Sequence, residues 1–236
     1  MARLKEYNGH YCESEYEYAF IGFLEAEGWK YSSGNNIRRI TKRDVLIADD
    51  FKKFIADTNP DLTEDEVIQI YDNVRLVGAE SDFATLHKVY GWMVNGVQFT
   101  TQDRLPRMIP LIDFDNWDKN IFRVVNQFTV EYTNNGQKEN RRPDVLLFVN
   151  GMPLCVVELK NPVDANATIY DAWEQINIRY WRDIPHLLHY CPLACISDGV
   201  KTRLGTVRTP YEHFYAWRRV NEGDVVSTLP FAETET

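Results

Sequence analysis

The sequence of 236 residues has few cysteines and no long apolar segment. Four cysteines in a chain of this length do not form a disulfide framework, which excludes a disulfide-stabilised extracellular scaffold. No apolar run reaches the ~18 residues that a membrane-spanning helix needs. The first ten residues, MARLKEYNGH, also lack the apolar core of a signal peptide. These absences predict a soluble protein of a reducing compartment, with no membrane partner.

The sequence also lacks an excess of basic residues. It has 26 Lys or Arg against 35 Asp or Glu, a formal charge of −9. Proteins that bind nucleic acid mainly by neutralising phosphates usually show a basic excess. Any contact between this chain and DNA must therefore be local, assisted by a metal ion, or shared with another subunit.

The pattern of elements predicts an α/β domain with a mixed central β-sheet flanked by helices. Apolar residues make up 44% and aromatic residues 13% of the chain, which excludes global disorder. Capping-box spacing predicts helices from Ser14, ending at Gly28, and from Thr63. Alternating apolar patterns, turn residues and a second helical period predict the remaining elements: strands at 97–100, 124–132, 144–149, 154–160 and 193–197, turns at 134–140 and 198–199, and a helix at 166–182. We assign residues 1–220 to one domain with a helical insertion at about 50–90, and residues 221–236 to a linker or truncated tail.

Three charged residues lie at the ends of two neighbouring apolar strands. Asp144 begins the first strand, and Glu158 and Lys160 end the second. Residues two apart in a strand share a face, so Glu158 and Lys160 project together. Two carboxylates and an amine on one sheet form a candidate Mg²⁺ site for hydrolysis of a phosphodiester. The alternative is an ordinary ion pair between Glu158 and a neighbouring basic residue.

The length of the turn between these strands determines their register, and the candidate site requires a particular register. With a two-residue turn at Asn150-Gly151, Asp144 would face Val157 and lie on the opposite side of the sheet from Glu158. The candidate site therefore requires either a three-residue turn with a left-handed Gly151 or a bulge in the strand. We predict such an irregularity.

The spacing of Asp144, Glu158 and Lys160 resembles the PD-(D/E)xK nuclease motif. The surrounding sequence is more specific. Residues 126–130 (NQFTV), 141–162 (RRPDVLLFVNGMPLCVVELKNP), 183–185, 196–199 and 13–31 closely resemble the N-terminal endonuclease domain of the restriction (R) subunit of type I restriction-modification enzymes. The likeness extends from about residue 12 to residue 217.

This resemblance implies a restriction-endonuclease-like core and cutting of double-stranded DNA without sequence preference. It implies that the cutting depends on Mg²⁺, for which Mn²⁺ can substitute. It implies that Asp144 and Glu158 bind the metal and that Lys160 is catalytic. Glu17 is the best match to a glutamate that often approaches the site from the first helix. The family also implies a bacterial or archaeal cytoplasmic protein whose partners are the modification and specificity subunits.

The full-length subunit of this family continues into an ATP-hydrolysing motor. This chain has no GxxxxGK[ST] phosphate loop, so we expect it to be an N-terminal piece of a longer subunit.

The helix after Lys160 departs from the family pattern, which has a glutamine and a tyrosine four residues apart. Here Gln175 is followed by Arg179 at that distance, and the tyrosine is Tyr180. Five residues correspond to about 140° around an α-helix, so we expect Gln175 and Arg179 to face DNA and Tyr180 to pack in the core.

Among several local basic clusters, Arg141 and Arg142 are the strongest candidates for DNA contacts, because they precede Asp144 directly. Histidines and cysteines between His186 and Cys195 are a weak candidate for a zinc site, since their spacing matches no standard zinc motif.

Two other functions remain open. The chain can be a nuclease-like docking module that is inactive outside a larger complex, or an enzyme that acts on free nucleic-acid ends.

Overall fold

The computed structural model describes residues 13–78, 81–161, 168–199 and 201–216. A mixed seven-stranded sheet with the order β1-β4-β7-β8-β9-β10-β11 forms its centre. The strands are β1 (Lys30–Ser33), β4 (Phe122–Asn126), β7 (Val145–Val149), β8 (Met152–Leu159), β9 (Leu193–Ser197), β10 (Thr202–Thr206) and β11 (Tyr215–Ala216). The pairs β1/β4 and β8/β9 are parallel and the other pairs are antiparallel. The predicted α/β class with a mixed central sheet is confirmed, and it is compatible with a restriction-endonuclease-like core.

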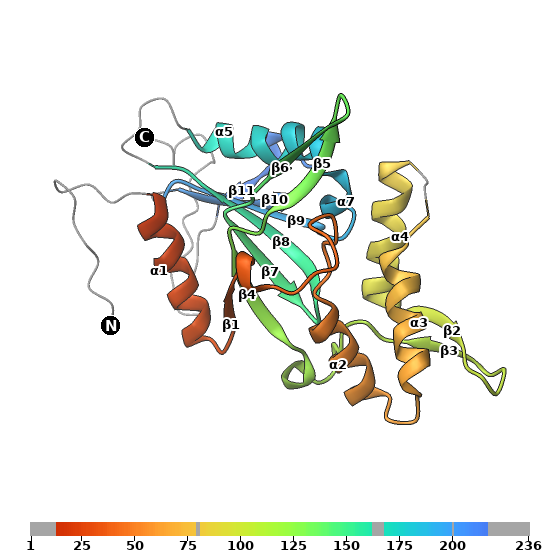
Figure 1. The fold of residues 1–236 in the computed structure, drawn as a ribbon. Helices are drawn as coiled ribbons and strands as arrows, with labels where there is room; N and C mark the ends of the chain where they lie inside the picture. Colours follow the sequence, from red (N-terminus) through yellow and green to blue (C-terminus); the bar gives the residue numbers. More distant parts are fainter. Residues whose placement is uncertain (1–12, 79–80, 162–167, 200, 217–236) are drawn as a thin grey trace.

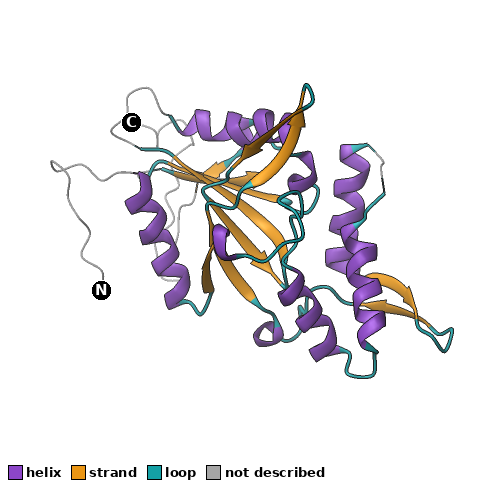
Figure 2. Ribbon diagram, viewed as in Figure 1, coloured by secondary structure: helices purple, strands orange, loops and turns teal. Residues whose placement is uncertain are grey.

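Helices cover both faces of this sheet (Figures 1 and 2). They are α1 (Glu13–Ala26), α2 (Ala48–Thr58), α3 (Glu64–Arg75), α4 (Asp82–Asn95), α5 (Ile169–Glu174), the π-helical η3 (Gln175–Tyr180), α6 (Trp181–Asp183) and α7 (Pro185–Leu188), with short 3-10 turns η1 (Gly34–Asn36), η2 (Trp117–Lys119) and η4 (Tyr211–His213). The two predicted N-terminal helices are present, and α3 has the complete Thr63–Glu66 capping box. Gly28, where the first helix was expected to end, has φ +90.

The sheet separates two apolar clusters because strand side chains alternate between faces. Val145 and Val157 pack on one face with Ile21 of α1. Leu146 and Val156 pack on the other face in the larger core, which also includes buried side chains of α2, α3, α4, α5 and η3. Side chains at positions 144 and 158 continue the second set, so they belong to the face covered by α5 and η3.

Two hairpins form separate two-stranded sheets outside the central sheet. They are formed by β2 (Val97–Thr100) with β3 (Pro106–Ile109), and by β5 (Val130–Asn134) with β6 (Gln137–Arg141). The second hairpin corrects the predicted turn at 134–140, because only Asn135 and Gly136 form the turn and the residues after them continue as a strand. Residues 134–140 are polar because this hairpin is largely exposed, and not because they all lie in a turn.

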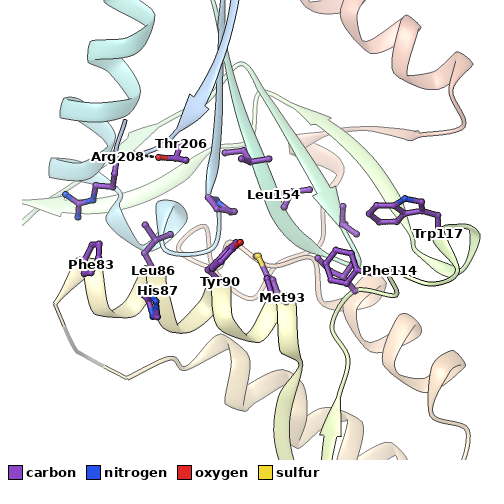
Figure 3. A pocket seen from close by; sticks show the side chains of 15 residues that line it. Phe83, Leu86, His87, Tyr90, Met93, Phe114, Trp117, Leu154, Thr206 and Arg208 are labelled. Carbon is purple, nitrogen blue, oxygen red and sulfur yellow. Dashed lines mark hydrogen bonds between the residues drawn. The ribbon is translucent and has the colours of Figure 1, made fainter. Parts of the chain in front are cut away.

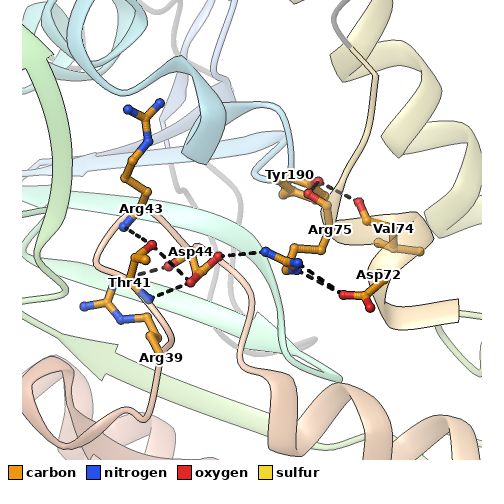
Figure 4. Close-up of polar contacts among 8 residues, drawn as sticks. All are labelled: Arg39, Thr41, Arg43, Asp44, Asp72, Val74, Arg75 and Tyr190. Atoms are coloured by element: carbon orange, nitrogen blue, oxygen red, sulfur yellow. Dashed lines mark hydrogen bonds and ion pairs between the residues drawn. The ribbon is translucent and has the colours of Figure 1, made fainter. Parts of the chain in front are cut away.

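The region predicted as a helical insertion contains α2, α3 and α4. Polar contacts connect the end of α3 to segments distant in sequence (Figure 4). Arg75 forms ion pairs with Asp72 and with Asp44, and the Tyr190 hydroxyl donates to the Val74 carbonyl oxygen at 2.6 Å. These contacts, together with the shared core, fix the helices to the sheet. The predicted tail at 221–236 lies outside the described residues.

The predicted irregularity between β7 and β8 is a bulge in the strand. The turn itself has two residues, Asn150 (φ 51) and Gly151 (φ 76), a combination typical of a type I′ turn. Phe148 pairs with Pro153, whereas Leu147 pairs with Cys155, so Leu154 is an extra residue in β8. Beyond the bulge Val145 pairs with Val157, and the next position places Asp144 opposite Glu158.

The turn between β7 and β8 is held by close packing around Gly151. A Cβ at this position would lie 2.3 Å from the Ile47 carbonyl oxygen and 2.8 Å from the Phe51 nitrogen. Gly136 has a similar φ of +78, but a Cβ there would meet nothing within 4 Å. Comparing alanine substitutions at the two glycines therefore separates the free-energy cost of the left-handed backbone from that of the steric overlap.

We predict that Gly136→Ala lowers the free energy of unfolding by roughly 1–2 kcal/mol, the cost of a left-handed alanine. Gly151→Ala should lower it by about 2–5 kcal/mol, because overpacking adds to that cost. Urea denaturation of both variants measures the difference. Equal losses would contradict the tight packing at Gly151.

Candidate functional site

The candidate site lies where β7 begins and β8 ends. The Asp144 carboxylate accepts a hydrogen bond from the Leu159 N–H at 2.9 Å, which fixes it at the end of the strand. Glu158 is completely buried. The register therefore brings Asp144 and Glu158 together on one side of the sheet, as the sequence predicts for a shared site.

Both oxygens of the Glu158 carboxylate accept hydrogen bonds from the helix that covers this face. Tyr180 Oη donates to Oε1 at 2.5 Å, and Gln175 Nε2 donates to Oε2 at 2.7 Å. Gln175 Nε2 also lies 2.9 Å from Tyr180 Oη. These partners satisfy the carboxylate but bring no positive charge to it.

Tyr180 packs in the core as expected, but its hydroxyl group also reaches Glu158, and the reason is the π-helical geometry of η3. A π-helix bonds i to i+5, so it places residues five apart on nearly the same side of the helix, whereas an α-helix does so for residues four apart. Gln175 and Tyr180 therefore both reach Glu158. Tyr180 is 1% exposed, so its ring packs in the core while its hydroxyl group belongs to the site. The five-residue spacing was the signal for this arrangement, but it predicts the contact only if the helix is not α-helical.

Lys160 joins the same network. Its Nζ donates to Gln175 Oε1 at 3.1 Å, so Gln175 lies between the lysine and Glu158. The sequence correctly placed Glu158 and Lys160 on one side of β8. Glu158 accepts hydrogen bonds from an amide and a hydroxyl, and the nearby charge of Lys160 lowers its pKa.

Burial raises the pKa of Glu158 well above its ordinary value, and the nearby Asp144 carboxylate raises it further. A carboxyl group whose pKa is higher in the folded than in the unfolded protein makes its full contribution to stability below the unfolded pKa. That stability is lost as the pH rises through the folded pKa. At neutral pH the Glu158 carboxyl group is therefore a destabilising element.

Glu17 lies in α1, on the other side of the sheet, and is 5% exposed. Its two oxygens accept hydrogen bonds from Asn126 Nδ2 at 2.6 Å and from Gln127 Nε2 at 2.7 Å. Burial raises the pKa of Glu17, these two hydrogen bonds oppose the rise, and the charge of Asp144 adds to it. Asn126 and Gln127 were noted in the sequence only as part of the family likeness, and no role was assigned to them.

A polar pocket of about 650 Å³ adjoins Gln175 and Tyr180. The three arginines predicted to contact DNA, Arg141, Arg142 and Arg179, all line it. The pocket is lined by Lys42, Thr129, Asn140, Arg141, Arg142, Gln175, Arg179 and Tyr180, a set without an acidic residue.

The three arginines of this pocket differ in how far nearby carboxylates neutralise their charge. Arg141 pairs with the buried Asp183 at 2.6 Å, which neutralises much of its charge. Arg179 lies 3.7 Å from Glu174, a weaker pairing. Arg142 is exposed and affects Glu17 electrostatically.

A second, apolar pocket of about 560 Å³ lies between α4 and the start of β9 (Figure 3). Phe83 and Tyr90 of α4 face Leu154, the bulged residue of β8, across this pocket. Since β9 begins at Leu193 here and ends at Ser197 beside Leu159, this pocket is at the opposite end of the strands from the carboxylates.

Within the described parts of the chain, no group of three or more His, Cys, Asp or Glu side chains is positioned to hold a metal ion. The pair Asp144 and Glu158 has the one or two carboxylates that Mg²⁺ usually takes from a protein. In the weak zinc candidate, His189 Nε2 lies 2.9 Å from Asp82 Oδ1. No described helix is both long and apolar enough to cross a bilayer.

Comparison with known proteins gives one consistent result. The family described as "Type I restriction enzyme R protein N terminus" matches residues 11–213. The chain is 34% identical over 223 residues to the "Putative type I restriction enzyme MjaIXP endonuclease subunit" of Methanocaldococcus jannaschii, which covers 90% of this chain and 21% of the relative. It is 30% identical over 233 residues to the type I restriction enzyme HindI endonuclease subunit of Haemophilus influenzae, covering 93% of this chain and 21% of the relative. The chain thus spans about a fifth of the length of these curated relatives.

The raised pKa of Glu158 predicts that Glu158→Gln increases the free energy of unfolding at pH 8 in EDTA, because it removes a buried charge next to Asp144. This increase in unfolding free energy should become smaller as the pH falls towards ~4.3, the pKa of an unfolded glutamate. Urea denaturation across this pH range measures it.

Glu66 provides the matched control for Glu158. It is also buried, but backbone N–H groups of Thr63 and Gln102 lower its pKa. Glu66→Gln should therefore decrease stability at pH 8. If both variants changed stability in the same direction, the environment assigned to Glu158 would be wrong.

The π-helical segment predicts that deletion of Ile178, which is 49% exposed, is tolerated. The deletion places Gln175 and the tyrosine four apart, which suits an α-helix and keeps both side chains on Glu158. Tyr180→Phe should then cost about 1–3 kcal/mol of unfolding free energy in the full chain and the same in the deletion background. A loss confined to the full chain would show that the deletion moves the tyrosine away from Glu158.

Proposed function

Because the chain belongs to the family of type I restriction enzyme R protein N termini, we propose that it is the Mg²⁺-dependent endonuclease domain of such an enzyme. It hydrolyses phosphodiester bonds of double-stranded DNA without sequence specificity of its own. The observation on which this proposal depends is the bulge-dependent register that places Asp144 opposite Glu158 at the strand ends. As in the family pattern, Asp144 and Glu158 hold the metal, and Lys160, Gln175 and Glu17 complete the site.

The residues present fit a divalent cation. The fully buried Glu158 carboxylate lies next to Asp144, and it accepts hydrogen bonds from the neutral groups of Gln175 and Tyr180. Two close carboxylates with neutral donors favour a cation between or beside them. When bound, Mg²⁺ supplies a Lewis acid and lowers the pKa of a coordinated water.

The protein's own groups orient the reactants. Tyr180 and Gln175 hold the Glu158 carboxylate in one orientation. Gln175 also holds the Lys160 ammonium through its Oε1, which keeps this donor next to the carboxylates, where it can bind the attacking water or a phosphate oxygen. Arg142 and Arg179 bind the neighbouring phosphates through the polar pocket, with Arg141 contributing less because of its pairing with Asp183.

The acidic balance of the chain explains why the domain would depend on partners. A net charge of −9 opposes strong binding of free DNA, so DNA has to be delivered by other parts of a complex. We infer that these are the modification and specificity subunits, in the cytoplasm of a bacterium or archaeon. The same charge supports the second candidate function, a nuclease-like docking module without activity outside the complex.

Lys160→Ala, introduced into the intact subunit and assembled with its partners, should reduce linearisation of covalently closed plasmid by at least ~100-fold in the presence of Mg²⁺. Lys138→Ala on the exposed strand β6 is the matched control and should cleave like the unmodified complex. If Lys160→Ala cleaved normally, Lys160 would not be catalytic. Absence of cleavage by the unmodified complex would favour the docking module.

A further inference from the structure

Gln127 makes two contacts that connect the helix α1 side of the sheet with the start of β7. Its backbone N–H donates to the Asp144 carbonyl oxygen at 2.9 Å. Its side-chain Nε2 donates to Glu17 Oε2 at 2.7 Å. One residue at the end of β4 thus binds both the backbone of a proposed metal ligand and the carboxylate of Glu17.

The backbone of Gln127 is in the left-handed region, with φ 54. This conformation is uncommon outside glycine and persists where the surrounding structure enforces it. The close approach of Gly34 is one such constraint, since a Cβ there would lie 2.6 Å from the Gln127 carbonyl oxygen and 2.6 Å from Phe128 Cα. The left-handed turn allows the backbone and side chain of Gln127 to point to different partners.

Asn126 holds the other oxygen of Glu17, and its own amide orientation is fixed. Asn126 Nδ2 donates to Glu17 Oε1, while Asn126 Oδ1 accepts from Tyr31 Oη at 3.1 Å. Asn126 is 3% exposed, so its role in packing and its role towards Glu17 cannot be separated by substitution. Gln127 is only partly buried, which makes it the better residue to test.

A buried carboxylate held by two neutral amides is a costly arrangement, because the amides bring no positive charge to offset its loss of hydration. The charges that act on Glu17 from nearby are those of Asp144 and Arg142. The arrangement keeps a negative charge at a fixed place near Asp144.

We propose that Gln127 is a positioning residue, which fixes the Glu17 carboxylate relative to Asp144 so that the negative charge of Glu17 strengthens cation binding at this end of the sheet without ligating the cation. This inference rests on the proposed function, since it assumes that Asp144 and Glu158 bind the metal. It assigns to Gln127 an effect on the metal site without contact to DNA or to the reacting atoms.

The first test is Gln127→Gly, with Mn²⁺ as the probe and its binding to the 236-residue chain measured by electron paramagnetic resonance. Glycine keeps the left-handed backbone and the N–H bond to Asp144 while the bond to Glu17 is lost. We expect Mn²⁺ affinity to fall about 5- to 20-fold with the urea midpoint nearly unchanged. Asn135→Gly, at another left-handed position (φ 47) in the β5–β6 hairpin, is the control and should leave affinity unchanged.

The second test exchanges the two partners. Gln127→Glu alone places two carboxylates against each other and should lower the urea midpoint. Combining it with Glu17→Gln restores an amide–carboxylate hydrogen bond, so the midpoint should recover. The negative charge is then on residue 127 instead of α1, and Mn²⁺ affinity should stay at least tenfold weaker. Recovery of both quantities would assign a purely structural role to the pair and overturn the proposal.

Asp144→Asn distinguishes this inference from the proposed function. If Asp144→Asn leaves Mn²⁺ affinity unchanged, the metal site itself is misplaced and both proposals fail. If Asp144→Asn weakens binding but Gln127→Gly does not, only the role of Gln127 is refuted.

Discussion

One extra residue in a β-strand determines whether the candidate site can exist. Side chains alternate between the faces of a sheet, so a register shift of one residue moves a side chain to the opposite face. The two-residue turn at Asn150-Gly151 would by itself place Asp144 and Glu158 on different faces. The bulge at Leu154 restores their common face within a single strand, without lengthening the turn.

The charged groups around this point follow a consistent arrangement. The buried carboxylates of Glu158 and Glu17 accept hydrogen bonds from neutral groups, namely the amides of Gln175, Asn126 and Gln127 and the Tyr180 hydroxyl. The arginines lie further out, in the polar pocket. These donors orient the carboxylates without neutralising them, the Lys160 ammonium lies beside them, and the arginines make the border positive. The proposed divalent cation and a phosphate at the border match this distribution.

The helix over the site illustrates how an irregular element brings two residues to one partner. Gln175 and Tyr180 are separated by five residues, one more than the spacing that the resemblance implies. In an α-helix this would turn the tyrosine away from Glu158. The π-helical η3 absorbs the extra residue, so the tyrosine keeps its place in the core and its hydroxyl group reaches the carboxylate. The bulge in β8 and the π-helix thus act on the same residue, Glu158, from the strand side and from the helix side.

The sequence by itself determined the α/β class, the helix beginning at Thr63, the strands around Asp144 and Glu158, and the need for an irregularity between them. These features depend on local periodicity, capping residues and strand alternation, which are properties of short segments. Tertiary structure decided where the bulge lies, that residues 137–141 form a strand, that Arg141 is paired with Asp183, and that Tyr180 and Gln127 belong to the site environment. These features depend on contacts between residues 5 to 110 positions apart, such as the bonds of Tyr180 to Gln175 and of Gln127 to Glu17. Packing of whole elements sets such contacts, and the five-residue spacing of Gln175 and Tyr180 indicates theirs only if the helix is π-helical.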